Sequence, residues 1–368
     1  MKVLILGVRG VPGVEGGVET HVEHLYPRLA AQGCDVEIIV RTPFIPPEQR
    51  RYGTIRLRRL WAPRRPGLEA FVHSVLGVIY AALVRPDILH IHAIGPAIVT
   101  PMARLLGLTV IVTNHGPDYN RDKWGSVARG VLRLGEYFGM RYAHGRIAIS
   151  KVIAELVEIK YERQSEIIPN GVLQNQPCRD TDQIERFGLH SGRYFLQVGR
   201  LVPEKRQLDL IQAYRSVSPR EWQLVIVGRI ADDPYSTAVS AAAREAGVVI
   251  TGFQSGQTLR QLYSHAGAFV LPSSHEGLPI ALLEALSYGV PTLASAIPAN
   301  LEVGLGEASY FPLGDIEALA MKLKQLSAQP WDAPARAKRQ RWVTERYDWD
   351  RIAAQTIKMY SRTIDQGS

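Results

Sequence analysis

Cysteine is scarce in this chain of 368 residues: Cys34 and Cys178 are the only two, and they lie far apart in the sequence. That count excludes a disulfide scaffold and is typical of a reducing, cytoplasmic compartment. Long hydrophobic runs are also missing. The longest, residues 70–84, contains His73 and is shorter than the ~20 residues that span a bilayer. The first ten residues pass directly into a strand-like run, so we expect no signal peptide.

Acidic residues are too few to balance the basic ones, 35 against 43, and the formal net charge is +8. This excess suits an anionic partner, such as nucleic acid, an anionic membrane or a phosphorylated substrate. Zinc-ligand spacing, a stacking-aromatic signature and a recognition helix are all missing, so nucleic acid is disfavoured. Basic side chains gather beside Trp61 and before an apolar segment, which is typical either of a solvated face or of a membrane-surface contact. They are Arg50, Arg51, Arg56, Arg58, Arg59, Arg64 and Arg65.

Buried-strand runs alternate with helical segments along the chain. The expected strands are residues 2–7, 35–40, 87–92, 108–115 and 146–150, then 194–200, 223–229, 247–253, 268–273 and 291–295. Such alternation predicts an α/β fold with parallel sheets that are covered by helices on both faces. Ligands of these sheets bind outside the carboxyl ends of the strands. Residues 167–182 contain Pro, Asn and Gly with little periodicity, and we place the linker between two domains there.

Residues 271–289, LPSSHEGLPIALLEALSYG, are the most informative stretch. Glu276 precedes a Gly-Leu-Pro turn that opens onto an apolar helix, with Pro279 in its first turn and Glu284 about two turns further on. The N–H groups of that turn and the helix dipole favour an anion such as a diphosphate. The two carboxylates can accept hydrogen bonds from hydroxyls at either end of the ligand, which predicts a nucleotide-sugar site. The alternative is a surface Glu, a loop and a buried helix.

Two cations follow the first strand of the second half. Arg200 begins the loop, and Lys205 lies near the start of the next helix. Together they can neutralise a diphosphate and stabilise the charge on it as it departs. The alternative is a surface pair with Glu204 or Asp209.

The glycine-rich loop at residues 7–20 is a candidate phosphate cradle, because Gly16 and Gly17 would let another molecule approach the next helix closely. The alternative is a flexible turn without a ligand. The loop lacks the spacing of a dinucleotide fingerprint, and the second strand ends in Arg41 rather than in an acid. Both features disfavour a nicotinamide-dependent oxidoreductase.

A polar cluster follows the strand at residues 108–115, at the expected ligand edge of the sheet. His115 is a candidate site residue there, although a lone histidine is often structural. Asp118 and Tyr119 are candidates for the same site, with helix capping as the alternative for Asp118. The histidines His21, His24, His90 and His92 do not form a convincing metal set, so we predict no metal.

With these residues in view, the chain resembles the retaining glycosyltransferases of the GT-B fold, family four of the sequence classification. The motifs that carry the resemblance extend over nearly the whole chain: GVEGGVET, TNHGPDY, IPNGV, VGRLVPEK, TGF and HEGLPIALLEALSYGVP. The opening GVRGVPGVEGGVET is similar to a subgroup of sugar transferases in bacterial polysaccharide assembly.

The resemblance implies two Rossmann-like domains that face each other across a cleft. The acceptor domain would span residues 1–172 and the donor domain residues 173–340, with a helical segment at 341–368 packing back on the first domain. The implied catalytic residues are His115, Arg200, Lys205 and Glu276. The donor would contact Gly16, Gly17, Arg200, Lys205, Gly252, Phe253, Glu276, Gly277, Leu278, Pro279, Ile280 and Glu284, and the acceptor would contact Glu19, Asp118 and Tyr119.

Within that implied site, Glu276 contacts sugar hydroxyls, Glu284 binds the ribose, and the backbone near Phe253 holds the base. The implied activity is a retaining, metal-independent sugar transfer from a nucleotide-diphosphate donor to a lipid-linked glycan, without a cofactor. The enzyme would serve cell-surface polysaccharide biosynthesis in the cytoplasm, peripherally at the inner face of the plasma membrane. A sugar-nucleotide epimerase and a non-catalytic assembly subunit are the alternatives.

One departure from the family concerns the sugar end of the site. Many relatives carry a Gly-Gly-x-Pro-Glu element after the second carboxylate, where this chain has SAIPANLEV at residues 295–303. Glu302 survives and the glycines do not, which leaves the identity of the sugar open.

Overall fold

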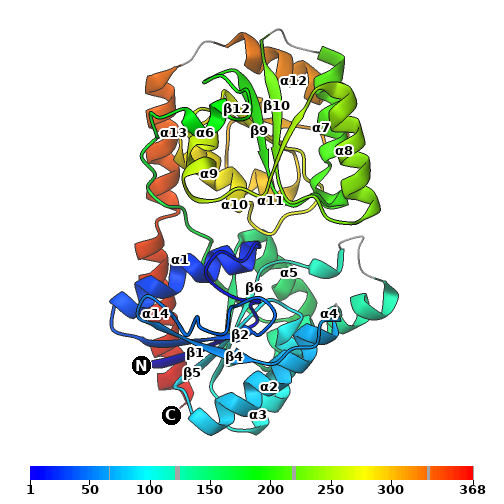
Figure 1. Cartoon of the computed structure of the whole chain (residues 1–368). Coiled ribbons are helices and arrows are strands. Elements are labelled where there is room, and N and C mark those ends of the chain that lie inside the picture. The colour runs from blue at the N-terminus through cyan, green and yellow to red at the C-terminus, as the bar shows by residue number, and fades with distance from the viewer. Residues whose placement is uncertain (66, 121–124, 218–220, 330–331, 368) are drawn as a thin grey trace. The chain divides into compact units, whose positions relative to one another are not determined.

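The computed structural model describes residues 1–65, 67–120, 125–217, 221–329 and 332–367. It divides into two compact units. Unit 1 comprises Met1–Gly171 and Tyr347–Ser368, and unit 2 comprises Val172–Arg346. Each unit has one mainly parallel sheet with helices on both faces (Figure 1), so the predicted α/β fold with two parallel sheets is confirmed. The sequence had suggested the return to unit 1 at residue 341, whereas unit 2 extends to Arg346.

The sheet of unit 1 has the strand order β3-β4-β2-β1-β5-β6-β7-β8, and only β3 is antiparallel to its neighbour. The short strands β3, β4 and β8 were not predicted. In β4, Ile55 and Leu57 are buried while Arg56 and Arg58 are exposed, and the basic run hid this alternation in the sequence. The strands are β1 (Lys2–Leu6), β2 (Asp35–Arg41), β3 (Arg51–Tyr52), β4 (Ile55–Leu60), β5 (Ile88–His92), β6 (Val110–Asn114), β7 (Gly145–Ala148) and β8 (Glu166–Ile167).

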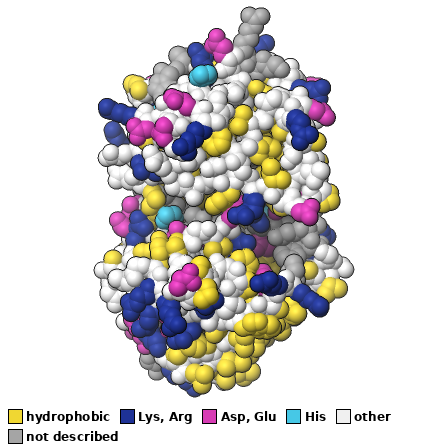
Figure 2. All heavy atoms as spheres, in the orientation of Figure 1, with side chains coloured by type: hydrophobic (Ala, Val, Ile, Leu, Met, Phe, Trp, Pro, Cys, Tyr) yellow, Lys and Arg dark blue, Asp and Glu magenta, His cyan; other side chains and the backbone are white. Residues whose placement is uncertain are grey.

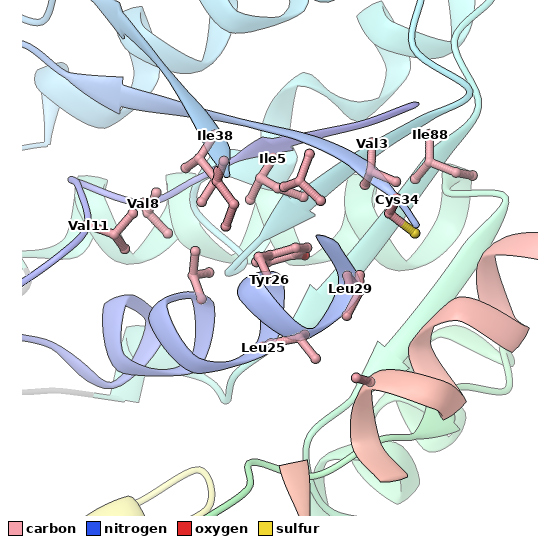
Figure 3. Packing of buried hydrophobic residues seen from close by; sticks show 14 of the residues in the cluster. Val3, Ile5, Val8, Val11, Leu25, Tyr26, Leu29, Cys34, Ile38 and Ile88 are labelled. Carbon is pink, nitrogen blue, oxygen red and sulfur yellow. The ribbon is translucent and has the colours of Figure 1, made fainter. Parts of the chain in front are cut away.

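Helices α1 and α14 pack against each other on one face of this sheet, and α2, α3 and α4 cover the other (Figure 1). Figure 3 shows Tyr26 and Leu29 of α1 directed toward Val3 and Ile5 of β1 in the core of the unit. The helices are α1 (Gly17–Ala31), α2 (Leu68–Val84), η1 (Pro96–Val99), α3 (Thr100–Leu105), η2 (Asp118–Asn120), α4 (Ser126–Tyr142), α5 (Lys151–Tyr161) and α14 (Trp349–Gly367). Among the described residues, none of the helices combines the length and apolar character that a bilayer crossing requires.

Helix α4 approaches the segment after β5 closely because of its glycines. A Cβ on Gly135 would lie 2.2 Å from the carbonyl oxygen of Ile94, whereas a Cβ on Gly130 would meet nothing within 4 Å. Only a residue without a side chain fits at Gly135, so this position sets how closely α4 packs against the segment that follows β5.

Unit 2 has a fully parallel sheet with the order β11-β10-β9-β12-β13-β14. Helices α7, α8 and α12 lie on one face, and α6, α9, α10 and α13 on the other (Figure 1). The strands are β9 (Tyr194–Val198), β10 (Gln223–Val227), β11 (Val249–Gly252), β12 (Ala268–Leu271), β13 (Thr292–Ser295) and β14 (Tyr310–Phe311). The helices are α6 (Asp182–Glu185), η3 (Pro203–Lys205), α7 (Gln207–Val217), α8 (Pro234–Ala246), α9 (Gly256–Ser264), α10 (Ile280–Ser287), α11 (Pro298–Leu301), η4 (Glu307–Ser309), α12 (Ile316–Ala328) and α13 (Ala333–Arg346).

Candidate active site

Two loops of unit 2 meet because the strands before them, β9 and β12, are parallel neighbours that end at the same edge of the sheet. Lys205 in the first loop donates to Glu276 Oε1 in the second, with Nζ 2.5 Å from the oxygen. The side chains are only 18% and 11% exposed, respectively. The backbone N–H of Ser274 also donates to the carbonyl of Glu204 at 2.9 Å. The structure therefore brings together two site residues that the sequence predicted separately.

Gln207, the first residue of α7, is hydrogen-bonded to the loop that carries Arg200. Its amide Nε2 donates to the carbonyl oxygen of Arg200 at 2.9 Å. The hydroxyl of Tyr235 accepts from the backbone N–H of Gln207 at 3.0 Å. Gln207 is fully buried, and the sequence analysis missed it. The available signal was a polar residue on the same helix face as Leu210 and Tyr214.

Helix α10 begins at Ile280, and Pro279 is the residue before it. The backbone N–H groups of Leu282 and Leu283 both donate to the carbonyl of Pro279, at 3.0 and 3.1 Å, which fixes the start of the helix. The predicted placement of Pro279 inside the first turn was therefore wrong by one residue. Glu284 is likewise just over one turn into α10 rather than about two. Gly277 and Leu278 lie in the turn that leads into this N-terminus.

Glu284 is held by Tyr263 of α9, which the sequence analysis did not identify. The Tyr263 hydroxyl donates to Glu284 Oε2 at 3.0 Å. The Tyr263 ring stacks on Tyr288, with ring centroids 5.4 Å apart and planes at 7°. Burial raises the pKa of Glu284 to about 7, and the hydrogen bond from Tyr263 opposes that shift. This carboxyl group therefore titrates near neutral pH.

The end of β11 presents the aromatic residue that the family resemblance assigned to the base. Phe253 is 40% exposed, directly after Gly252, whose φ is +74°. The guanidinium of Arg229 lies 5.7 Å from the Phe253 ring centroid. An exposed ring with a cation beside it offers an apolar face to a flat ligand.

In unit 1, Glu19 is engaged within its own loop. Its Oε1 accepts from the backbone N–H and Nε of Arg9, at 3.2 and 3.0 Å. Gly16 has a φ of +155°, which L side chains rarely adopt, so its backbone conformation already favours glycine there without a ligand. Gly17 is the first residue of α1. An acceptor would have to compete with Arg9 for the carboxylate of Glu19.

The loop after β6 places its three predicted site residues differently. His115 and Asp118 are partly exposed. Tyr119 is only 4% exposed, and its hydroxyl donates to Glu136 Oε2 at 2.9 Å, which leaves little of it for an acceptor to contact. Glu136 is fully buried on α4 and also accepts from Asn114 Nδ2 at 3.1 Å. Glu136 thus anchors the loop, and the sequence analysis missed it.

Three histidines from α1, β5 and the loop after β6 cluster beside these residues. One ring nitrogen each from His21, His92 and His115 lie within 4.8 Å of one another. The spacing of the sequence does not group His21 and His92 with His115, because the three residues come from separate elements. Nδ1 of His92 is 3.0 Å from Nε2 of His115. Burial lowers the pKa of His21 to about 4 and holds the pKa values of the other two well below their ordinary value, so all three are neutral.

Comparison with known proteins agrees with this architecture. The family described as Glycosyltransferase Family 4 matches residues 15–173, and the family described as Glycosyl transferases group 1 matches residues 180–358. A sucrose-phosphate synthase from Thermosynechococcus elongatus has the same fold, with a TM-score of 0.85, 21% identity and 99% of each chain covered.

Two curated relatives are mannosyltransferases. O-antigen chain mannosyltransferase B of Escherichia coli is 29% identical over 56% of this chain and 54% of its own, so the match spans about half of that relative. GDP-mannose:cellobiosyl-diphosphopolyprenol alpha-mannosyltransferase of Xanthomonas campestris is 27% identical over 79% of this chain and 77% of its own. With both family matches and the fold in agreement, the chain belongs to the group 1 glycosyltransferases of the GT-B fold.

Proposed function

We propose that this protein transfers a sugar from a nucleotide-diphosphate donor, bound on unit 2, to a hydroxyl of a lipid-linked glycan acceptor, with retention of anomeric configuration. The Lys205–Glu276 ion pair beside the N-terminus of α10 is the observation that carries the proposal. It places a cation, a carboxylate and helical N–H groups together at one edge of the sheet. The cation and the N–H groups can bind a diphosphate, and the carboxylate can accept hydrogen bonds from a sugar.

The proposed chemistry uses the chain's own positive charge. As the bond between the anomeric carbon and the diphosphate oxygen breaks, Lys205, Arg200 and the α10 N-terminus stabilise the departing diphosphate. The acceptor oxygen bonds to the same face of the sugar, and its proton passes to the released phosphate oxygen. Glu276 orients sugar hydroxyls, Glu284 binds the ribose and Phe253 contacts the base. We propose no cofactor and no bound metal, and trapping of a sugar on an enzyme side chain would contradict this path.

The proposal of a lipid-linked acceptor rests on the surface of unit 1. Trp61 is 60% exposed and Leu83 79% exposed, and Trp61, Arg64, Arg65 and Leu68 line one shallow hollow. Figure 2 shows Lys and Arg side chains beside a band of hydrophobic ones on the part of the surface that unit 1 forms. Cations next to exposed apolar groups favour an anionic membrane surface, so we propose a peripheral contact at the inner face of the plasma membrane.

Two of the seven arginines contribute less to this contact than the sequence suggested. Arg56 pairs with Asp35 at 2.9 Å and Arg58 with Glu37 at 3.3 Å. Sedimentation with phosphatidylglycerol vesicles at low salt checks the contact. We expect wild-type binding, weaker binding of Trp61→Ala with Arg64→Ala, and unchanged binding of Arg56→Ala. Equal sedimentation with uncharged phosphatidylcholine vesicles, or none with either, would contradict it.

Thermal unfolding with UDP, GDP, ADP and dTDP tests the donor site. A nucleotide at about 100 times its dissociation constant stabilises the folded state by about 2.7 kcal/mol, which is visible as a rise in melting temperature. We expect one nucleotide to stabilise the wild type but not Lys205→Ala or Glu284→Ala. Arg206→Ala is the matched control, because Arg206 pairs with Asp209 instead. No stabilisation by any nucleotide would favour the non-catalytic assembly subunit.

Product analysis with the matching nucleotide-sugar then tests the reaction. We expect a product with the anomeric configuration of the donor, read from the proton coupling at the anomeric carbon. An epimer of the donor with no acceptor consumed would show a sugar-nucleotide epimerase instead.

A further inference from the structure

A hydrogen-bonded chain of buried side chains runs behind His115 in unit 1. From His115, the contact at 3.0 Å leads to His92 Nδ1, and His92 Nε2 lies 2.6 Å from the Tyr26 hydroxyl. That hydroxyl lies 2.8 Å from His90 Nδ1 and 3.3 Å from the hydroxyl of Tyr360. Tyr360 in turn lies 2.6 Å from His90 Nδ1. These groups come from α1, β5 and α14, so three separate elements supply the chain.

The contact at the far end of the chain favours one direction for the protons. His90 Nε2 lies 2.7 Å from Thr113 Oγ1, which makes no other hydrogen bond among the described residues. The Thr113 hydroxyl proton has an acceptor among the described residues only if it is donated to His90 Nε2, and this arrangement leaves the proton of His90 on Nδ1. The hydroxyls of Tyr26 and Tyr360 both lie near His90 Nδ1. A single Nδ1–H group can donate to both hydroxyl oxygens at once. An unprotonated Nδ1 has one lone pair and could accept a hydrogen bond from only one of these hydroxyls.

The same assignment of donors and acceptors can be continued along the chain to His115. Because His90 Nδ1–H donates to the tyrosine oxygens, the Tyr26 hydroxyl can donate its proton in a hydrogen bond to His92 Nε2. His92 then carries its proton on Nδ1 and donates it to His115 Nε2. A neutral His115 keeps its proton on the other nitrogen, and no described residue accepts a hydrogen bond from that nitrogen.

We propose that this buried chain holds His115 as the Nδ1–H tautomer, so that its imidazole is a hydrogen-bond donor to a bound ligand and not a proton acceptor. Tyr26, His90, His92 and Tyr360 are then positioning residues. The proposal rests on the proposed function insofar as the ligand is a substrate oxygen, such as a sugar hydroxyl or a phosphate oxygen.

The same proton count bears on metal binding. A divalent ion bound through the facing nitrogens of His92 and His115 would need a lone pair on each of them, where this arrangement places a proton. The side chain of His21 fits a hydrogen-bonded role too, because its Nδ1 lies 2.9 Å from Asn170 Oδ1 and donates to it. The histidine cluster is accordingly a hydrogen-bonded support and not a metal centre.

Histidine tautomers can be read directly in the full-length protein labelled with ¹⁵N-histidine, by two-bond ¹⁵N–¹H correlation. Comparison with His115→Asn assigns the His115 signals. We expect the Nδ1–H pattern for His115 in wild type and in Tyr80→Phe, a matched control whose hydroxyl bonds Arg58 and Glu37 instead. In Tyr26→Phe we expect His115 to become a mixture of tautomers. An Nε2–H His115 in wild type, or an unchanged signal in a folded Tyr26→Phe, would overturn the proposal.

Kinetics supply a second readout. The side-chain amide of Asn can donate from about the position of Nδ1, so His115→Asn should retain at least about tenfold more kcat than His115→Ala, which is about 1.4 kcal/mol. Equal losses in both variants would contradict the donor role. Nucleotide-induced stabilisation should persist in both, since those contacts belong to unit 2. If the protein binds nucleotide but transfers no sugar, the proposed function is wrong. The tautomer experiment would still test this inference, because it does not depend on sugar transfer.

Discussion

The hydroxyl of Tyr263 lies 3.0 Å from Oε2 of Glu284 and donates a hydrogen bond to it. This contact opposes the effect of burial, which raises the pKa of the carboxyl group to about 7, so about half of the groups are in the ionised form at neutral pH. The predicted ribose contact of Glu284 depends on that form, because a carboxylate accepts hydrogen bonds without donating any.

Nucleotide affinity should therefore rise with pH through about 7 and level off above it. Ribose hydroxyls bind the ionised carboxylate better, so binding lowers the pKa of Glu284 and releases a proton. Calorimetric titration from pH 5.5 to 8.5 in buffers of different ionisation enthalpy measures both effects. Glu284→Gln should bind more weakly and show no such rise, and an equal rise in that variant would contradict the assignment.

Removing the Tyr263 hydroxyl should move this titration upward. The hydrogen bond lowers the pKa of Glu284, so Tyr263→Phe should raise the midpoint of the affinity curve while the ring stack on Tyr288 remains. Leaving the carboxylate without its donor should cost about 1–3 kcal/mol of unfolding free energy.

The sign of the pH dependence of that loss follows from the raised pKa. A carboxyl group whose pKa rises from 4.5 to about 7 on folding destabilises the folded state increasingly across that window. The loss in Tyr263→Phe should thus be larger at pH 8 than at pH 5. Tyr214→Phe, which removes a hydroxyl that bonds the carbonyl of Trp222, is the control and should lose stability equally at both values.

Lys205→Ala should lower kcat by about 10²–10³, the usual cost of losing one group that stabilises developing negative charge. It should also leave Glu276 without its cation. Arg206→Ala removes a neighbouring cation that is about one-third exposed and paired with Asp209, and it should change the activation free energy by no more than about 1 kcal/mol. Steady-state kinetics with saturating donor compare the two variants, and equal losses would argue for a general charge effect.

Two alanine substitutions in α4 should have opposite effects on stability. At Gly135 the added methyl group meets the Ile94 carbonyl oxygen, so overpacking should cost about 1–3 kcal/mol or more. At Gly130 the methyl group meets nothing, and Ala should stabilise the helix by about 0.5–1 kcal/mol. Urea unfolding followed by fluorescence measures both, and shifts in the same direction would contradict the packing described here.

Much of unit 2 could be predicted from the sequence because the parallel topology brings the carboxyl ends of β9 and β12 together. That geometry makes Lys205 and Glu276 neighbours before any side chain is placed. The partnership of Tyr263 with Glu284 could not be predicted, because it depends on how α9 packs beside α10. The sequence predicts both helices, but it does not predict how each is rotated about its own axis relative to the other.

The histidine chain was missed for a related reason. His90 and His92 alternate along β5 with apolar residues, a pattern typical of a half-exposed strand, although β5 is buried throughout. The register of β5 on β6 sets His90 opposite Ile111 and His92 opposite Thr113, and only that register brings His92 near His115. Tyr360 joins from a helix 268 positions further on than His92, and no local pattern indicates such a contact.

The chain leaves unit 1 after Gly171 and returns at Tyr347. A ribosome therefore delivers Trp349 and Tyr360, both buried in the core of unit 1, only after all of unit 2 has been added. Unit 2 is continuous in the chain, so its folding can be complete before α14 is available to unit 1. During synthesis, the part proposed to hold the donor can therefore fold first, and the tautomer proposed for His115 can be set only after α14 has been added.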